Sequence, residues 1–247
     1  MRAAERRLCF FWSLKIRSNI YVDGFNLYYG AVKDTAYKWL DVSELCRQIV
    51  PGITINRIRY FTALVKSSPT DPQMAQRQQF YIRALETLPS LTVHYGHFLQ
   101  SITTMRLASP PAAGSATARV LKMEEKGSDV NLATYMLVDA FRKDCDQIIV
   151  ITNDSDLAEP IRIINKELKI PVGVLNPHTQ DTANRRHRLG GRAGQAPKAT
   201  PSIELRKVAK FSRDITSEGA QSHVARSQFP AQFTDAQGRT LKKPSTW

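Results

Sequence analysis

Short apolar segments alternate with amphipathic segments along the middle of the chain, and the two patterns predict strands and helices in turn. β-branched and aromatic residues dominate the apolar segments, whereas the amphipathic segments carry a helical period or capping residues. The predicted strands cover residues 20–22, 55–63, 91–98, 148–151 and 172–175. The predicted helices cover residues 41–50, 71–88, 129–142, 156–168 and 204–211. Such alternation is typical of an α/β domain whose mainly parallel, Rossmann-like central sheet is flanked by helices.

Local signals refine three of these elements. The unbroken run 148–151 consists of Ile and Val only, as expected of a parallel strand that is buried on both faces. Asp71 followed by Pro72 predicts an N-cap and the first position of the helix over 71–88. Residues 109–115 predict a loop. The apolar face expected for the helix over 129–142 comprises Val130, Ala133, Leu137, Ala140 and Phe141.

The amino-acid composition of the chain changes toward both ends. We expect an N-terminal extension over residues 1–18, a domain over 19–179, a basic flexible insert over 180–201 and a C-terminal segment over 202–247 that packs on the domain as irregular structure. The apolar run near the N-terminus is short and lacks a small-residue cleavage site, so we expect a dispensable extension and not a signal peptide. No run approaches the ~20 apolar residues of a membrane span, and no membrane partner is expected.

Charge is distributed unevenly. The chain of 247 residues has 35 Lys and Arg against 22 Asp and Glu, a net charge of +13. Residues 1–17, 181–200 and 201–247 each carry a net +4, which leaves a net +1 for residues 18–180. Such an excess of positive charge favours an anionic partner, with nucleic acid the first candidate. The basic flanks therefore predict attraction to phosphates around a nearly neutral domain.

Cysteine and histidine patterns argue against two other classes. Cys9, Cys46 and Cys145 are odd in number and widely spaced, which argues against a disulfide framework or a zinc ribbon and favours a reducing cytoplasm. The five histidines lack the HxxxH or HExxH spacing of a zinc site.

Acidic residues follow two of the predicted strands and begin one helix. Asp23 ends the first strand with Asn26 three residues later, Asp154 and Asp156 follow the strand over 148–151, and Asp129 begins a helix. Because sites in parallel sheets form outside the carboxyl ends of strands, we expect these carboxylates to converge. Hard oxygen ligands suit Mg²⁺ or Mn²⁺, and a cation would offset the repulsion between like charges.

Each of these acids also has a plainer interpretation. Asp23-Gly24 is a common hairpin turn, Asp156 with Glu159 forms a possible N-capping pair, and Asp129 suits the dipole of its helix. Asp154 has no evident structural task in the sequence. A metal ligand can also cap a helix, so these interpretations are not exclusive.

Other acids are expected to lie elsewhere. Asp144 and Asp146 precede the strand over 148–151, and eight extended residues, up to ~26 Å, separate Asp146 from Asp154. Asp139 lies about 15 Å along its helix from Asp129, at ~1.5 Å per residue. We predict that all three are solvated at the surface.

Three sequence blocks together resemble the NYN domain family, in its LabA-like branch of the PIN-like nuclease superfamily. They are Tyr21-Val-Asp-Gly-Phe-Asn-Leu-Tyr-Tyr29, Glu124-Glu-Lys-Gly-Ser-Asp-Val-Asn-Leu-Ala-Thr134 and Thr152-Asn-Asp-Ser-Asp-Leu-Ala-Glu-Pro-Ile161, in the order and spacing of that family. The resemblance covers residues 19–177 and resumes in parts of the C-terminal segment. It implies a Rossmann-like, PIN-type domain with an acidic, metal-dependent ribonuclease site.

The resemblance also implies site residues. The acidic positions of the family match Asp23, Asp129, Asp154 and Asp156, with Asn26 as their polar companion. The chain departs from the wider family at Tyr135, where many members have Asp, and at Asn153, where many have Gly. The first departure leaves the number of metal ions, one or two, open.

The resulting hypothesis is hydrolysis of RNA phosphodiesters, single-stranded RNA included, with Mg²⁺ or Mn²⁺. Asp23 and Asp154 would be direct ligands, Asp129 would complete the site, and Asp156 or Asn26 would orient ligands or water. Lys126 and the basic side chains of the insert would contact phosphates; the best candidates in the insert are Arg185, Arg186, Arg188 and Arg192. A solvated surface position explains Lys126 better than a phosphate contact does, and it explains the arginines equally well.

Two rival functions are considered. A non-catalytic nucleic-acid-binding or regulatory module would keep the fold without cleavage. A phosphatase of the haloacid dehalogenase type would need a second Asp two residues after Asp23, where the chain has Phe25. The sequence leaves the RNA, its cleavage specificity and the oligomeric state open, a homo-oligomer included.

Overall fold

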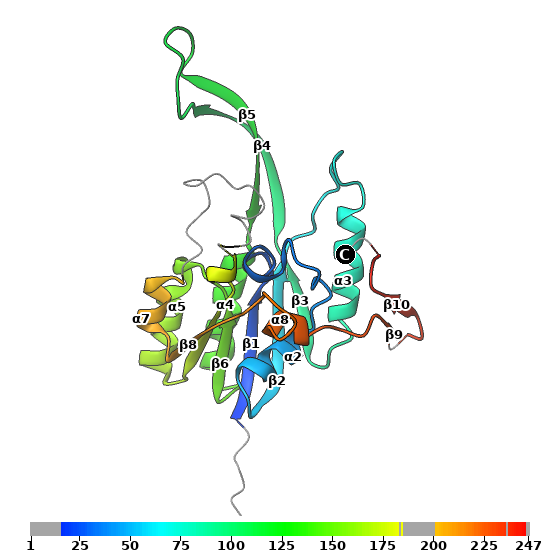
Figure 1. Cartoon of the computed structure of the whole chain (residues 1–247). Helices are drawn as coiled ribbons and strands as arrows, with labels where there is room; N and C mark the ends of the chain where they lie inside the picture. The colour runs from blue at the N-terminus through cyan, green and yellow to red at the C-terminus, as the bar shows by residue number, and fades with distance from the viewer. Residues whose placement is uncertain (1–15, 183, 185–200, 236, 246–247) are drawn as a thin grey trace, which may run out of the picture.

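A six-stranded parallel sheet forms the centre of the computed structural model, which describes residues 16–182, 184, 201–235 and 237–245 (Figure 1). Its order is β3-β2-β1-β6-β7-β8, and every neighbouring pair is parallel. The strands are β1 (Ile16–Asp23), β2 (Ile53–Thr62), β3 (Leu91–Tyr95), β6 (Gln147–Ile151), β7 (Val172–Asn176) and β8 (Phe211–Asp214). The predicted α/β class with a mainly parallel sheet is confirmed.

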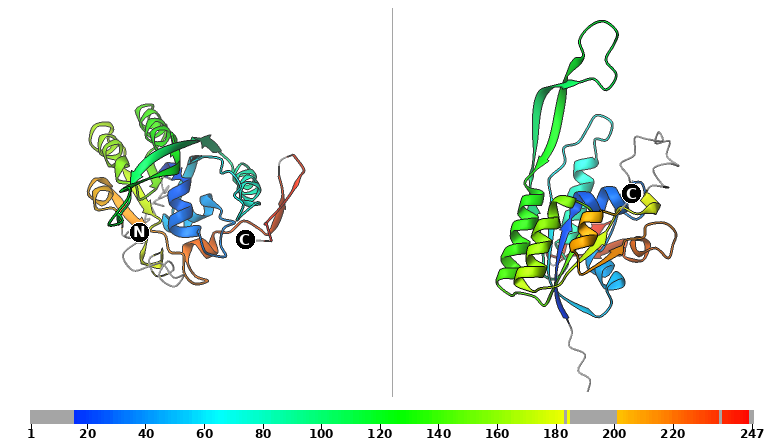
Figure 2. Two further views of the ribbon diagram at one scale, coloured as in Figure 1. Left: turned by 90° about the horizontal axis from the view of Figure 1, so that it is seen from above. Right: turned by 90° about the vertical axis from the view of Figure 1, so that its left-hand side faces the viewer.

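Helices cover both faces of this sheet, as Figure 2 shows from above and from the side. The first face carries α1 (Gly24–Leu27), η1 (Tyr28–Val32), α2 (Val42–Ile49), α3 (Met74–Leu85) and α8 (His223–Arg226). The second face carries α4 (Ser128–Phe141), η2 (Ser155–Leu157), α5 (Ala158–Ile163), η3 (Ile164–Leu168) and α7 (Ile203–Val208). Alternation along β1 fills both cores, because Ile20 and Val22 pack on the first face and Tyr21 on the second.

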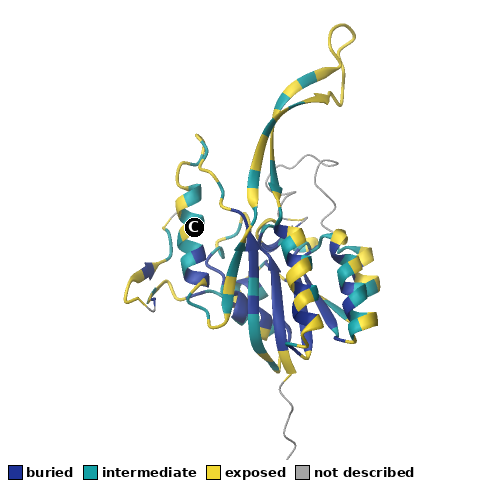
Figure 3. Ribbon diagram, turned by 180° about the vertical axis from the view of Figure 1, so that it is seen from behind, coloured by how far each residue is buried: buried dark blue, intermediate teal, exposed yellow. Residues whose placement is uncertain are grey.

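A long antiparallel hairpin projects beyond the carboxyl edge of the sheet (Figure 1). It consists of β4 (His97–Arg106) and β5 (Thr117–Lys126), and both strands are largely exposed (Figure 3). The strand predicted over 91–98 is divided at Gly96, between β3 and β4. The loop predicted over 109–115 joins the two hairpin strands. A second hairpin, β9 (Gln232–Thr234) with β10 (Thr240–Lys242), lies in the segment predicted to be irregular.

Several element boundaries differ from the prediction. β1 begins at Ile16, so residues 16–18, which were predicted to belong to the N-terminal extension, are part of this strand. Asp71 does not cap α3, which begins at Met74; its carboxylate instead pairs with Arg77. The helix predicted over 204–211 ends at Val208, and the chain then enters β8.

The buried face of α4 differs from the predicted one. Val130 and Phe141, expected in the core, are 70% and 77% exposed. Ala140 is buried as predicted, and Ala133 and Leu137 are partly buried against the core of the second face. The other buried residues of the helix are Ser128, Leu132, Met136 and Asp139, so its buried side is turned toward a row that includes a charged residue.

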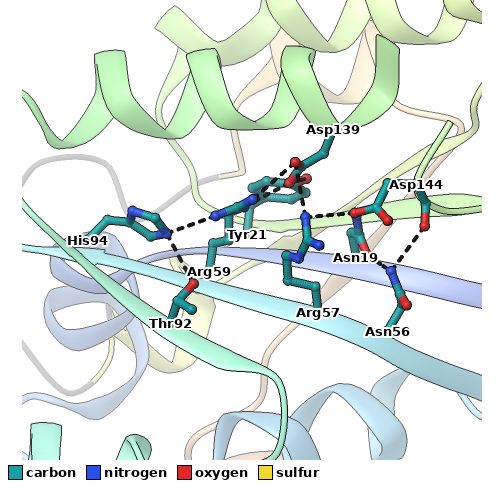
Figure 4. A network of polar contacts seen from close by, with 9 residues as sticks. All are labelled: Asn19, Tyr21, Asn56, Arg57, Arg59, Thr92, His94, Asp139 and Asp144. Carbon is teal, nitrogen blue, oxygen red and sulfur yellow. Dashed lines mark hydrogen bonds and ion pairs between the residues drawn. The ribbon is translucent and has the colours of Figure 1, made fainter. Parts of the chain in front are cut away.

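Asp139 is fully buried, so its predicted place at the solvated surface is wrong (Figure 4). Its Oδ2 accepts hydrogen bonds of 2.7 Å from the Tyr21 hydroxyl and from Nε of Arg59, and its Oδ1 accepts bonds from Arg57 and Arg59. Burial alone would raise the pKa of Asp139, but the hydrogen bonds from Arg59 and Tyr21 and the charges of both arginines outweigh it and lower the pKa. The sequence pattern of α4 does not reveal these two arginines, because both lie on β2, about 80 residues earlier in the chain.

Asp144 and Asp146 lie at the amino end of β6, away from the carboxyl edge. Asp146 is exposed and accepts hydrogen bonds from the Arg17 backbone and side chain, as expected of surface residues. Asp144 is only partly exposed and pairs with Arg57 at 2.7 Å, so its predicted solvation is wrong in part. Among the described residues, no helix has both the length and the apolar composition that crossing a membrane requires.

Candidate functional site

The strand order reverses direction between β1 and β6. From β1 the chain proceeds outward to β2 and β3, whereas from β6 it proceeds the other way to β7 and β8. At such a switch point the connections leave a crevice outside the carboxyl ends of the two strands. Val22 pairs with Ile151, so Asp23 and Thr152 follow directly at this crevice.

Asp23 is 5% exposed and held by three hydrogen bonds. Its Oδ1 accepts from the Asn26 backbone N–H at 2.9 Å, and its Oδ2 accepts from Asn26 Nδ2 at 2.7 Å and Thr152 Oγ1 at 3.1 Å. Burial raises its pKa, the hydrogen bonds oppose that shift, and the charge of Asp154 adds to it. The carboxylate is thereby fixed in orientation.

Gly24 lets the chain turn from β1 directly into α1. A Cβ at this position would lie 2.7 Å from the Phe61 carbonyl oxygen and 2.8 Å from the Tyr60 ring. The Asp23 side chain caps α1 through the Asn26 N–H. The hairpin interpretation of Asp23-Gly24 is therefore wrong, because a helix follows.

Asp154 also has a structural task that the sequence did not reveal. Its Oδ1 accepts a 3.0 Å hydrogen bond from the Asp156 N–H and caps η2. Its own N–H donates to Thr152 Oγ1 at 3.0 Å, so the Thr152 hydroxyl links Asp23 to Asp154. The predicted capping pair of Asp156 with Glu159 is not formed, since Glu159 pairs with Arg162.

Two asparagines connect the crevice to the C-terminal segment. Asn26 Oδ1 accepts a 3.3 Å hydrogen bond from the Asn153 N–H. Asn153 Oδ1 accepts a 2.7 Å bond from the N–H of Ser202, the N-cap of α7. The side-chain amide of Asn153, where many proteins of the resembled family have Gly, thus connects α7 to the edge of the site.

Asp129 approaches the crevice from the beginning of α4. Gly127, at φ 96°, permits the turn from β5 into the helix, and Glu125 Oε1 accepts hydrogen bonds from the N–H and hydroxyl of Ser128. Asp129 as a residue is exposed. Partial desolvation and the charges of Asp23 and Asp154, followed by those of Glu125 and Asp156, raise the pKa of its carboxyl group to about 6.

Because the charges of Asp23, Asp154 and Asp156 all raise the pKa of Asp129, the four predicted acids share one region of negative charge. None of them forms an ion pair with a lysine, arginine or histidine in the described part of the chain. Within residues 16–182, 184, 201–235 and 237–245, no three acidic, histidine or cysteine side chains already form a ligand cluster. The donor set, all carboxylate and amide oxygens without a matching cation, fits Mg²⁺ or Mn²⁺ chemically.

The other predicted contact residues have different positions. Lys126 Nζ lies 3.6 Å from Glu124 Oε2, and half of its side chain is exposed. The predicted phosphate contacts Arg185, Arg186, Arg188 and Arg192 lie outside the described residues. Tyr135, the other departure from the resemblance, lies against His94, at a ring distance of 4.3 Å, and under the Arg59 guanidinium.

Two supporting residues were not predicted from the sequence. Thr152 bonds to Asp23 and Asp154, and Glu125 bonds to Ser128, the residue before Asp129. Thr152 was detectable, because it is the residue directly after a buried strand. A cavity beside Asp23 was not detectable. It measures about 150 Å³, lies between α1, η1 and α3, and is lined largely by aromatic and apolar side chains, with Gly24, Phe25 and Tyr60 on the side of the crevice.

Comparison with known proteins adds a family and one curated relative. The NYN domain family matches residues 17–187. A protein named 6-hydroxy-3-succinoylpyridine 3-monooxygenase HspA, from Pseudomonas putida, is 29% identical over an alignment of 186 residues, which covers 66% of this chain and 60% of that protein. A solved structure of a protein of unknown function from Vibrio parahaemolyticus is similar at a TM-score of 0.46 with 17% identity, over 81% of this chain and 93% of that one.

Proposed function

The chain belongs to the NYN domain family, whose fold is nuclease-like, and from this premise we propose that it is a metal-dependent endoribonuclease. The observation that carries the proposal is the pair of carboxylates Asp23 and Asp154 at the switch point of the sheet. They are linked through Thr152 and lack a basic partner among the described side chains. A buried carboxylate such as Asp23, with a second, partly exposed carboxylate beside it, is costly unless a cation binds there.

The chain's own residues prepare the site. Asp23 and Asp154 would hold Mg²⁺ or Mn²⁺, and Asp129 would complete the ligand set. When bound, such an ion supplies activation of water and stabilisation of charge on the phosphate. Asn26 and Thr152 keep the Asp23 oxygens oriented through their hydrogen bonds, which is the usual task of residues behind metal ligands. The exposed Asp156 would orient water.

Removal of metal provides the first test. We expect a labelled single-stranded RNA to be cut internally in the presence of Mn²⁺ or Mg²⁺, and EDTA in excess to stop the cutting. The products are separated by gel electrophoresis, and RNA binding is measured on the same samples. Cleavage that continues at full rate in EDTA would contradict the proposal, and binding without cleavage under any metal would favour a non-catalytic binding module instead.

The basic insert would attract RNA without reading its sequence. Replacing Arg185, Arg186 and Arg188 together by Ser should weaken RNA binding and reduce the dependence of log K on log salt by about 2, at ~0.7 per lost phosphate contact. Cleavage of bound RNA under single turnover should be unchanged. Fluorescence anisotropy from low to high salt measures the slope, and an unchanged slope would show that these arginines do not contact phosphates.

The Pseudomonas relative favours a second candidate function. Its name describes monooxygenation of a hydroxypyridine, a small planar ring, and the aromatic-lined cavity beside Asp23 is of a suitable size for such a ring. This chain matches only 60% of that protein's length. A monooxygenase would need dioxygen and a two-electron reductant, so consumption of oxygen with a hydroxypyridine, unaffected by Asp154→Asn, would distinguish it from the nuclease.

The subfamily and the domain boundaries are proposed from the sequence. The three motif blocks support the LabA-like branch, and the division into a nuclease domain over 19–179, a basic insert over 180–201 and a packing segment over 202–247 follows their limits. Cys46 and Cys145 are buried and free, which suits a reducing compartment such as the cytoplasm.

A further inference from the structure

The cavity beside Asp23 is lined by two hydroxyl groups that have no hydrogen-bond partner among the described residues. Tyr60 and Thr62 are 6% and 4% exposed, both line the cavity, and they lie two residues apart on the same face of β2. Neither hydroxyl forms a hydrogen bond within the described residues. By contrast, the hydroxyls of the buried Tyr21 and the partly buried Tyr81 donate to Asp139 and to the Leu40 carbonyl oxygen.

Hydroxyls in this position can recognise a ligand. Both side chains are more than nine-tenths buried and their hydroxyls open to the cavity, so a polar molecule inside it would supply the hydrogen bonds that the described residues do not. Two such groups that face one cavity supply a pair of donors and acceptors for a polar molecule inside it. The cavity is therefore suited to a ligand with polar atoms on its edge.

The walls of the cavity indicate a flat ring. Phe25, Tyr28 and Tyr81 contribute aromatic surface, and Val65 and Met74 add apolar surface. A cavity of about 150 Å³ accepts a benzene-sized molecule, which is close to the size of one six-membered ring. The volume therefore matches one ring better than a bicyclic purine.

The surroundings of the cavity suit a nucleotide. Lys38 lines it and has no ion pair with a carboxylate of the described chain, whereas the neighbouring Arg77 is paired with Asp71. The cavity also adjoins the candidate catalytic edge, because Gly24 follows Asp23 and contacts the Tyr60 ring. Lys38 is thus available to the phosphate of a nucleotide whose base is held in the cavity.

We propose that this cavity binds a pyrimidine base of the RNA, and that cleavage is thereby directed to positions beside pyrimidines. Uracil and cytosine are single six-membered rings with a carbonyl oxygen at position 2, which can accept a hydrogen bond from Tyr60 or Thr62. The aromatic walls provide stacking. The inference rests on the proposed nuclease function for its substrate, but the binding of the base can be measured without cleavage.

Titration calorimetry of the full chain in EDTA with the four nucleoside 5′-monophosphates tests the cavity directly. Uridine and cytidine monophosphate should bind about tenfold more tightly than the adenosine and guanosine compounds. Tyr60→Phe removes one hydroxyl and should weaken pyrimidine binding about threefold to tenfold. Tyr21→Phe is the matched control, because Tyr21 lies on the other face of the sheet and its hydroxyl donates to Asp139; it should lower stability but keep the preference. Equal binding of all four nucleotides, or an unchanged preference in Tyr60→Phe, would overturn the proposal.

Cleavage and ligand competition separate this proposal from the nuclease function. If oligouridine and oligoadenosine are cut with equal kcat/KM and no nucleotide is preferred, the base site is wrong although the nuclease function stands. If pyrimidine nucleotides bind as predicted but no RNA is cut, the nuclease function fails and the base site stands. A free hydroxypyridine that binds through Tyr60 while uridine monophosphate does not bind would overturn the assignment to RNA.

Discussion

Asp154→Asn is expected to reduce RNA cleavage at least about a hundredfold while the fold is retained. The carboxylate is a proposed direct ligand, and loss of one charged ligand removes both affinity for the ion and its correct position. Asn is itself a good N-cap, so the hydrogen bond from the Asp156 N–H that begins η2 can persist. Single-turnover cleavage in saturating Mn²⁺, with circular dichroism of the same protein, measures both effects.

Asp146→Asn is the matched control for that variant. Asp146 lies at the opposite end of β6, exposed and paired with Arg17, and the same change of charge there should leave the cleavage rate within about twofold. A loss of activity in Asp146→Asn equal to that in Asp154→Asn would mean that overall charge, and not position, is responsible. Full activity of a folded Asp154→Asn protein would remove Asp154 from the site.

The second large effect is on stability. Asp139→Asn should lower the free energy of unfolding by about 3 to 5 kcal/mol, because it removes the charge that compensates Arg59 and leaves Arg57 with Asp144 alone. Asp139 is fully buried, and the Arg59 side chain is 12% exposed, so solvent does not replace the lost partner. Urea denaturation of both proteins measures the difference. A change below about 1 kcal/mol, comparable to that of a surface pair such as Arg17 with Asp146, would contradict this account of the network.

The same network predicts a dependence on pH. The pKa of Asp139 is lower in the folded protein than the ordinary value of about 3.9 in an unfolded chain. Its ionised form therefore contributes stability that is complete above this ordinary value and is lost as the pH falls through it toward the folded pKa. Between pH 7 and pH 3 the wild type should lose more stability than Asp139→Asn does. Parallel curves for the two proteins would show that other carboxylates control acid unfolding.

Much of the sheet could be predicted because its strands have distinctive sequences. The run from Ile148 to Ile151 is buried on both faces, and its β-branched residues permit few alternatives. The meeting of Asp23 with Asp154 followed from a general property of parallel sheets, namely that carboxyl ends of neighbouring strands lie at one edge. Capping was less predictable: Asp41 caps α2 at the predicted beginning of that helix, whereas Asp71, with a similar local signal, does not cap α3.

The remainder depends on contacts between distant segments. The β4–β5 hairpin has weak alternation because both of its faces are exposed, with Ile102 at 65% and Leu121 at 61%. Burial of Asp139 required Arg57 and Arg59, which precede it by about 80 residues. The cavity lined by Tyr60 and Thr62 is a space between elements, and no sequence period encodes such a space.

The central claim is that the carboxylates at the β1–β6 crevice hold the metal ion on which RNA cleavage depends. Mn²⁺ occupancy measured by electron paramagnetic resonance, compared with the single-turnover cleavage rate over the same Mn²⁺ concentrations, tests it most directly. We predict that the two curves coincide in the wild type, and that the double variant Asp23→Asn/Asp154→Asn loses both Mn²⁺ binding and cleavage. Mn²⁺ binding that is undiminished in the folded double variant, or cleavage that proceeds without bound Mn²⁺ or Mg²⁺, would contradict the claim.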